Sequence, residues 1–267
     1  MAVYIRTLCS GSDGNCTFVS DGTTHLLIDA GLSLRTAEEA LSQINIKPSA
    51  LSGILVTHEH TDHIKGIDMI SHKHGVPIYA TYSTWTALEQ KPVKRVALKN
   101  RIAFDNDGDF YINDFNIQPF SIPHDAADPV AYCIVNRGKK IIIATDMGYI
   151  RSDFIARTRD ASFMIIESNY DPEMLRQSAY PSYLKARISG RNGHLSNNDC
   201  ASTLCDVVSS GSVRQILLGH LSKNSNTPDI ALNTCAQALT QMGVVMSKDV
   251  VVGVAPRSTP GHLLKIS

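Results

Sequence analysis

The chain has 267 residues, of which 43% are hydrophobic and 19% are charged, and 25 Lys and Arg residues balance 25 Asp and Glu residues. This composition is ordinary for a globular protein, and the neutral balance excludes a globally basic surface, so that any nucleic-acid surface must be a local patch. The six cysteines form no CxxC pair, and the sequence shows no secretory signal and no long apolar segment. We therefore expect a soluble, cytoplasmic protein with reduced thiols and no membrane partner.

Short β-like runs alternate with helical segments along the chain. Runs rich in Val, Ile, Phe and Tyr, bounded by turn residues, predict strands at 2–8, 16–20, 24–29, 53–57, 76–80, 109–112, 115–122, 130–135, 140–145, 163–168, 213–220, 250–254 and 262–266. Helices are predicted at 34–44, 63–75, 197–211 and 228–243. For the last helix, Thr227 is the expected N-cap, Pro228 lies in the first turn and Gly243 is the stop. No linker or repeat divides the chain, so we expect one α/β domain over residues 1–267, with packed sheets and helices outside them.

The segment VTHEHTDHIKG, residues 56–66, places three histidines and an aspartate within six positions. It follows a predicted strand, and ligands of α/β proteins bind at the carboxyl ends of strands. His58 and His60 are two residues apart and can chelate one metal, whereas Asp62 and His63 can aim at a second point. A polar loop with surface histidines is the alternative. Four ligand-type residues on one strand-to-helix turn favour a metal site.

Three further candidate ligands also follow predicted strands, namely His124, Asp146 and His220. Any one of them alone could be a capping or hydrogen-bonded polar residue. Together with the cluster, they could hold two divalent ions with Asp146 as a bridge. Such ions, about 3.5–4 Å apart, activate water and stabilise a leaving oxygen. Because the set contains no cysteine, zinc and manganese both fit.

The pattern HxHxDH over residues 58–63, followed by His124, Asp146 and His220, resembles the metallo-β-lactamase superfamily. The segments GSDGNCTFV, RNGHLSNNDCA and LLGHLSKNSNTP are similar to the YycJ (WalJ) group, described as 5′-to-3′ DNA exonucleases. The resemblance implies an α+β fold, a four-layer αββα sandwich with metals at one edge, and Asp29 as a support behind the site. The implied ligands of one metal are His58, His60 and His124, and those of the other are Asp62, His63 and His220, with Asp146 between them.

A departing alkoxide needs a proton, and His194 is the expected acid. It precedes a predicted helix, and Glu167 ends a predicted strand from which a carboxylate could orient the imidazole. The arrangement is similar to the Glu–His pair of the tRNA 3′-processing enzymes of this fold. The alternative is that His194 caps its helix or contacts phosphate. The expected catalytic residues are therefore Asp62, His194 and Glu167.

Two segments are candidates for binding the phosphates of a substrate. The Gly- and Ser-rich turn SGSDGN, residues 10–15, could cradle a phosphate, although an ordinary hairpin turn is the alternative. The basic segment YDPEMLRQSAYPSYLKARISGRNG, residues 170–193, contains tyrosines and leads to His194. This composition favours nucleic acid as the substrate. The candidate phosphate contacts in these two segments are Ser10, Ser12, Asn15, Arg187 and Arg191.

Three functions remain open from the sequence. The first is a metal-dependent phosphodiesterase that acts on nucleic-acid ends, for which the resemblance favours a 5′-to-3′ exonuclease on DNA, with RNA as the other possible substrate. The second is a small-molecule hydrolase of the same fold that cleaves a cyclic phosphodiester, thioester or lactone. The third is a non-catalytic binding module, which the intact set of ligand positions disfavours. The oligomeric state stays open.

Overall fold

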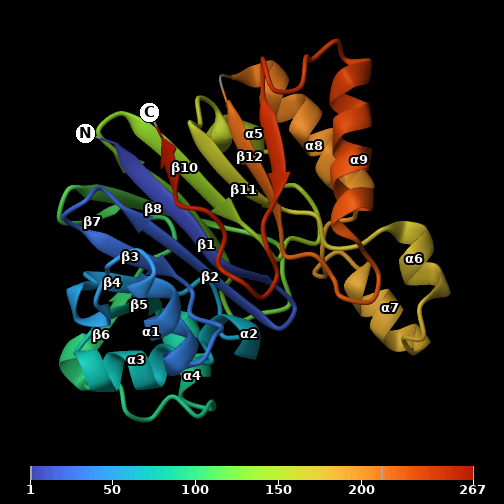
Figure 1. The fold of residues 1–267 in the computed structure, drawn as a ribbon. Helices are drawn as coiled ribbons and strands as arrows, with labels where there is room; N and C mark the ends of the chain where they lie inside the picture. Colours follow the sequence, from blue (N-terminus) through green and yellow to red (C-terminus); the bar gives the residue numbers. More distant parts are fainter. Residues whose placement is uncertain (1, 212, 267) are drawn as a thin grey trace.

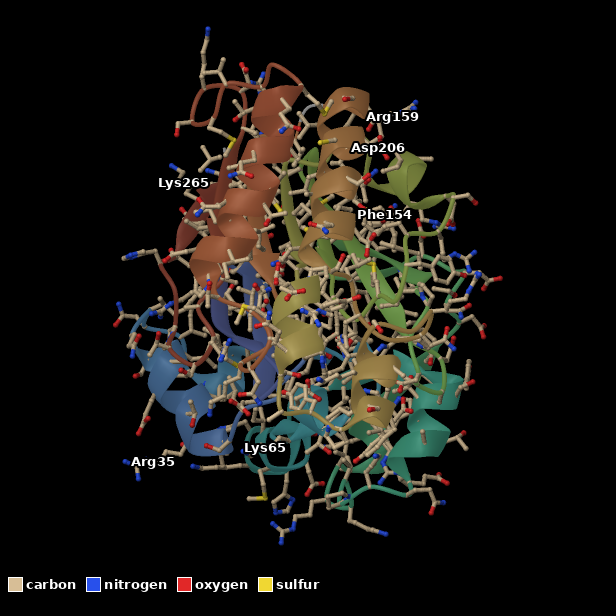
Figure 2. The ribbon with its side chains drawn as sticks, turned by 90° about the vertical axis from the view of Figure 1, so that its right-hand side faces the viewer. Arg35, Lys65, Phe154, Arg159, Asp206 and Lys265 are labelled. Carbon is tan, nitrogen blue, oxygen red and sulfur yellow. The ribbon has the colours of Figure 1, made fainter. Side chains whose placement is uncertain are left out.

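The computed structural model describes residues 2–211 and 213–266. Two seven-stranded sheets face each other, and helices cover their outer sides (Figure 1). This arrangement is the αββα sandwich that the sequence predicts. Charged side chains such as Arg35, Lys65 and Lys265 extend outward from it (Figure 2).

The first sheet consists, in spatial order, of β14 (Leu264–Ile266), β1 (Val3–Gly11), β2 (Gly14–Ser20), β3 (His25–Ile28), β4 (Gly53–Leu55), β5 (Ile78–Thr81) and β6 (Arg101–Phe104). The second sheet consists of β13 (Val251–Val254), β12 (Gln215–Gly219), β11 (Phe163–Glu167), β10 (Lys139–Ala144), β9 (Val130–Asn136), β8 (Phe115–Ser121) and β7 (Phe110–Ile112).

One group of helices covers the outer side of each sheet (Figure 1). The helices that pack on the first sheet are α1 (Leu34–Ser42), α2 (Thr61–Ile64), α3 (Ile67–His74) and α4 (Tyr82–Leu88). Those that pack on the second sheet are α5 (Phe154–Thr158), α8 (Asn197–Ser210) and α9 (Pro228–Gln241). Helices α6 (Pro172–Gln177) and α7 (Ser182–Ile188) project from the body of the molecule. Within the described ranges, no helix is both long and apolar enough to cross a membrane.

Apolar side chains fill three layers of the sandwich. One buried cluster, which includes Ile5, Phe115 and Tyr132, lies between the two sheets. Two further clusters pack the outer faces of the sheets against their helices. Strands β10 and β11 are therefore buried on both faces, which explains why their sequences are continuous apolar runs rather than alternating ones.

Several elements differ from the predicted ones, including the short helices α4, α5, α6 and α7, which the sequence did not predict. The sequence did not predict β6, whose four residues begin with Arg101 and are mostly half-buried. The helix predicted over 63–75 is two helices, α2 and α3, because the chain turns at Gly66 against the loop between β3 and α1. A Cβ at Gly66 would lie 2.3 Å from the carbonyl oxygen of Leu32. The predicted N-cap of α9 is confirmed, since Thr227 accepts a hydrogen bond from the Ile230 N–H.

Parallel strands bring the candidate site residues to one edge of the sandwich. Strands β3 and β4 are parallel in the first sheet, and β10, β11 and β12 are parallel in the second. Asp29, Asp146 and His220 follow three of these strands with φ angles of 58°, 64° and 55°. Left-handed backbone is uncommon for residues other than glycine, and it concentrates at functional sites.

Candidate metal centre

The HxHxDH segment connects β4 to α2. His58 and His63 are buried, whereas the side chain of His60 keeps 26% of its exposure. Helix α2 begins at Thr61, two residues before the predicted helix start at residue 63, so Asp62 and His63 both lie in its first turn.

One group of donor atoms comes from His58, His60 and His124, whose nitrogen atoms lie within 4.8 Å of one another. His124 follows β8, and its Nε2 is 3.2 Å from Nδ1 of His60. Nδ1 of His124 lies 3.0 Å from the carbonyl oxygen of Gly193 and donates to it. That bond selects the tautomer that leaves Nε2 as the donor to a metal.

A second group comes from Asp62, His63 and His220. Oδ2 of Asp62 is 3.3 Å from Nε2 of His63 and 3.4 Å from Nε2 of His220. Nδ1 of His63 donates to Oδ2 of Asp29 at 2.7 Å, which leaves Nε2 of His63 turned toward the group. Asp29 thus stands behind the ligand set.

Asp146 lies between the two groups. Its Oδ1 is 3.7 Å from Nε2 of His124 and 3.3 Å from Nδ1 of His220. Its Oδ2 is 3.2 Å from Nε2 of His63. One carboxylate therefore contacts members of both groups, as a bridging ligand must.

Three buried atoms of this set make no hydrogen bond within the described part of the chain: Nε2 of His58, Oδ2 of Asp146 and Nε2 of His220. Unpaired buried polar atoms are costly, so atoms that all point to one small region indicate a partner there. Burial, and next the charge on His63, lower the pKa of His58 well below its usual value. Burial would also lower the pKa of His63, but the carboxylates of Asp146, Asp29 and Asp62 outweigh it and raise that pKa well above its usual value. A metal ion would bind these imidazoles in their neutral form. The donor set fits a divalent metal.

Glu167 ends β11 and is fully buried. Its Oε1 accepts from Nδ1 of His194 at 2.8 Å and from Nδ1 of His220 at 2.7 Å. Its Oε2 accepts from the N–H groups of Met147 and Leu195. Burial alone would raise the pKa of Glu167, but the charge and hydrogen bond of His194 outweigh it and lower the pKa to about 2. The expected Glu167–His194 pair is brought together.

The predicted turn over residues 10–15 is the end of the β1–β2 hairpin, in which Ser10 pairs with Asn15, and it contacts the ligand set more closely than the sequence indicated. Ser10 is buried, and its Oγ accepts a hydrogen bond from the His220 N–H at 2.9 Å. Nδ2 of Asn15 donates to the Gly11 carbonyl and lies 3.2 Å from Oδ2 of Asp62. Ser12, at the tip of the turn, is exposed. Of the three expected phosphate contacts in this turn, only Ser12 stands open to solvent.

The two candidate arginines lie near the same edge. Arg187 donates to both carboxylate oxygens of Asp125, at 2.6 and 3.1 Å. Asp125 in turn lies 3.5 Å from Nε2 of His124. The guanidinium carbon of Arg191 lies 4.8 Å from the ring centre of Tyr149. The sequence did not point to Asp125 or Tyr149, although Asp125 directly follows a ligand candidate.

A buried amide network behind His220 was also missed. Nδ2 of Asn169 donates to the carbonyl oxygen of His220 at 2.8 Å. Asn226 donates to the carbonyl of Asn169 and to the side chain of Asn197. A signal was present, since Asn197 and Asn226 belong to two of the segments that resemble the exonuclease group.

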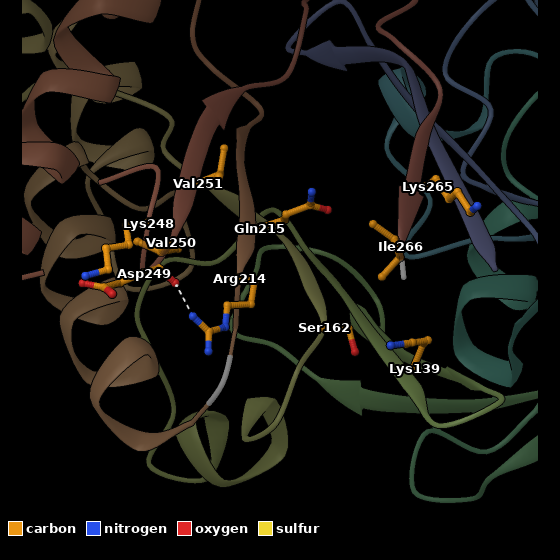
Figure 3. Close-up of a pocket in the computed structure, with 10 residues that line it drawn as sticks. All are labelled: Lys139, Ser162, Arg214, Gln215, Lys248, Asp249, Val250, Val251, Lys265 and Ile266. Carbon is orange, nitrogen blue, oxygen red and sulfur yellow. Dashed lines mark hydrogen bonds between the residues drawn. The ribbon is translucent and has the colours of Figure 1, made fainter. Parts of the chain in front are cut away.

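A pocket of about 460 Å³ lies elsewhere on the molecule (Figure 3). Its lining includes Gln215 and Val251, which begin β12 and β13, and Ile266 of β14. Asp146 and His220 lie at the other end of the second sheet, where they follow the carboxyl ends of β10 and β12. The pocket is therefore separate from the metal-ligand candidates.

Comparison with known proteins decides the family. The model of the β-lactamase superfamily domain matches residues 24–220. The chain belongs to the β-lactamase superfamily. The matched segment of this superfamily member contains every metal-ligand candidate from His58 to His220.

Individual relatives agree with this assignment. The superfamily member is 35% identical over 243 residues to exodeoxyribonuclease YycJ of Bacillus anthracis, which covers 91% of each chain. It is also 35% identical over 243 residues to exodeoxyribonuclease WalJ of Streptococcus pneumoniae, covering 91% of this chain and 90% of the relative. The solved structure of the metallo-β-lactamase fold protein YhfI from Bacillus subtilis has a TM-score of 0.75 at 16% identity, covering 99% and 100% of the two chains. The last likeness shows the fold.

Proposed function

We propose that this protein is a metal-dependent exodeoxyribonuclease that degrades DNA from the 5′ end. The observation that carries the proposal is the position of Asp146, whose two oxygens contact members of both donor groups. The relatives named exodeoxyribonuclease, at 35% identity over 91% of this chain, support the choice of DNA over RNA. We also propose a cytoplasmic location, because the relatives named exodeoxyribonuclease come from bacteria, whose DNA lies in the cytoplasm.

The proposed ligands form two sets that share one carboxylate. His58, His60 and His124 would hold one ion, Asp62, His63 and His220 the other, and Asp146 would bridge them. Two divalent ions, zinc or manganese, would lower the pKa of water and neutralise charge on the phosphate that is attacked.

The side chains around these ligands would position the reacting groups. The carboxylate of Asp62 keeps 23% of its exposure and can accept a hydrogen bond from the attacking water. His194 has its Nδ1–H bound to Glu167, so that when the ring is protonated on both nitrogens its Nε2 can donate a proton to the departing sugar oxygen. Glu167 orients that imidazole through its buried carboxylate. Ser12 and Arg187 would contact phosphates of the strand.

A panel of substrates tests the proposal. The purified protein, loaded with Mn²⁺ or Zn²⁺, is given 5′-phosphorylated single strands, duplexes, RNA of the same sequence, and bis-p-nitrophenyl phosphate. We expect release of mononucleotides from the labelled 5′ end of DNA, and a ladder of shortened products when the 3′ end is labelled.

A matched pair of variants controls the assay. His58→Ala should abolish degradation, whereas His72→Ala, a substitution of an exposed histidine on α3, should leave it unchanged. Efficient hydrolysis of a small ester without degradation of either nucleic acid would instead favour a small-molecule hydrolase of the same fold. A ladder from the 5′ label would reverse the proposed polarity.

A further inference from the structure

A tyrosine and an arginine from different loops meet close to the proposed metal ligands. Tyr149 lies three residues after Asp146, and Arg191 lies three residues before His194. The guanidinium carbon of Arg191 is 4.8 Å from the centre of the Tyr149 ring. Tyr149 keeps 38% of its exposure, so part of its surface remains open to a ligand.

The backbone that carries this pair is packed tightly against the site. A Cβ at Gly148 would lie 2.1 Å from the carbonyl oxygen of Arg191, so only glycine allows the two loops to approach this closely. The Gly148 N–H donates to the carbonyl of Pro123, the residue before the ligand candidate His124. The Tyr149–Arg191 pair is thereby held at a fixed place relative to the proposed ligands.

Tyr149 is part of the lining of a pocket of about 440 Å³. This volume falls within the range of roughly 300–1,000 Å³ that is typical of small-ligand sites. Gly148, Tyr149 and Leu195 line it on the side of the site loops, and Asp199 and Asp206 line it from α8. Asp206 is labelled on that helix in Figure 2. Arg151 also lines the pocket, but its guanidinium donates to Asp153. The carboxylates of Asp199 and Asp206 can accept hydrogen bonds from the amino groups of a nucleobase.

We propose that Tyr149 and Arg191 form a stacking platform for one nucleobase of the DNA strand that is being cut. The inference deepens the proposed exonuclease function and rests on it. Every base has a π-face, so an aromatic ring binds single strands with little dependence on sequence. An arginine over the ring adds a cation–π contribution. Arg191, expected from the sequence to contact phosphate, is assigned here to the base.

Substitutions at Tyr149 test the platform on the full-length, metal-loaded protein with single-stranded DNA as the probe. Tyr149→Ala should raise KM by about 5- to 150-fold with a smaller change in kcat, as the loss of one stacked base predicts. Tyr149→Phe should behave as the unsubstituted protein, because the ring is kept. Tyr149→Leu fills the space without a ring and should fail like the alanine variant. Tyr111→Ala, at an exposed tyrosine on edge strand β7, is the matched control.

Salt dependence separates stacking from phosphate contact. Tyr149→Ala should weaken binding without changing the slope of log affinity against log salt concentration, because tyrosine carries no charge to replace a counterion. A series of substrates carries one abasic residue at successive positions from the 5′ end. At a single position, the unsubstituted protein should bind the abasic strand more weakly than the intact strand. At that position, Tyr149→Ala should bind the two strands equally.

Each failure has a distinct meaning. In one failure, the unsubstituted protein degrades DNA, but Tyr149→Ala has an unchanged KM, or Tyr149→Leu has the KM of the unsubstituted protein. The platform is then wrong and the exonuclease function stands. If the unsubstituted protein neither binds nor degrades DNA, both proposals fall.

Discussion

Asparagine at position 29 would test how the ligand set is oriented. Asp29 accepts from the Thr57 N–H through Oδ1, and from the Thr57 hydroxyl and Nδ1 of His63 through Oδ2, at 2.8, 2.8 and 2.7 Å. Asparagine has nearly the same size and tolerates the left-handed backbone at this position, where φ is 58°. The Asp29→Asn variant therefore changes the hydrogen bonding with little strain on the loop.

The magnitude follows from what the amide presents to His63. If the amide oxygen keeps the bond to the Thr57 N–H, an NH₂ group replaces the oxygen that Nδ1 of His63 contacts. His63 must lose that bond or move its proton to Nε2, the atom 3.2 Å from Oδ2 of Asp146 that a metal would need. Loss of such a supporting contact typically weakens metal affinity about 10- to 100-fold, which is about 1.4–2.7 kcal/mol.

Competition with a chromophoric chelator at neutral pH measures that affinity. Asp21→Asn is the matched control, because Asp21 is also buried and accepts from backbone N–H groups, of Thr23 and Thr24, in the turn between β2 and β3. The control should lower Tm and leave metal affinity unchanged. An Asp29→Asn variant that binds metal as tightly as the unsubstituted protein would refute the orienting role of Asp29.

Three further outcomes are expected. Elemental analysis should find up to two transition-metal ions per chain, lost in His220→Ala and retained in His194→Ala; the reverse pattern would exchange the two assignments. His194→Ala should lower kcat on DNA by about 10²–10⁴-fold and lose far less on bis-p-nitrophenyl phosphate, whose leaving group needs no proton, so that equal losses on both substrates would contradict the acid role. Burial raises the pKa of Asp21, but hydrogen bonds from Thr24 and Thr23 outweigh it and hold that pKa below 3.8. Its stabilisation is therefore present above pH 3.8 and lost as the pH falls through the lowered value, and the difference in Tm between the unsubstituted protein and Asp21→Asn should shrink at acid pH.

Much of the sandwich could be predicted because its central strands are buried on both faces. Continuous apolar runs such as those of β10 and β11 are visible in the sequence without knowledge of their partners. The short helices α4, α5, α6 and α7 were missed, since five to seven residues carry little helical periodicity and depend on tertiary contacts. The break at Gly66 likewise depends on the close approach of the Leu32 carbonyl, a neighbour that the local pattern does not reveal.

The donor residues were predictable for a different reason. Histidines and aspartates at the ends of apolar runs are rare enough to be noticed, and the parallel strands bring those ends to one edge. Contacts such as Arg187 with Asp125 or Arg191 with Tyr149 join residues whose meeting follows from loop geometry alone. No spacing in the sequence specifies them.

Glu167 shows how the two kinds of information combine. The sequence pointed to it as the partner of His194, because it ends a strand ahead of that histidine. In the structure, Oε1 of Glu167 accepts hydrogen bonds from Nδ1 of both His194 and His220, at 2.8 and 2.7 Å. A single buried carboxylate therefore fixes the tautomer of a proposed metal ligand and the ring orientation of the proposed acid together. Any change at Glu167 must disturb metal binding and proton transfer at once, so the acid role can be isolated only at His194.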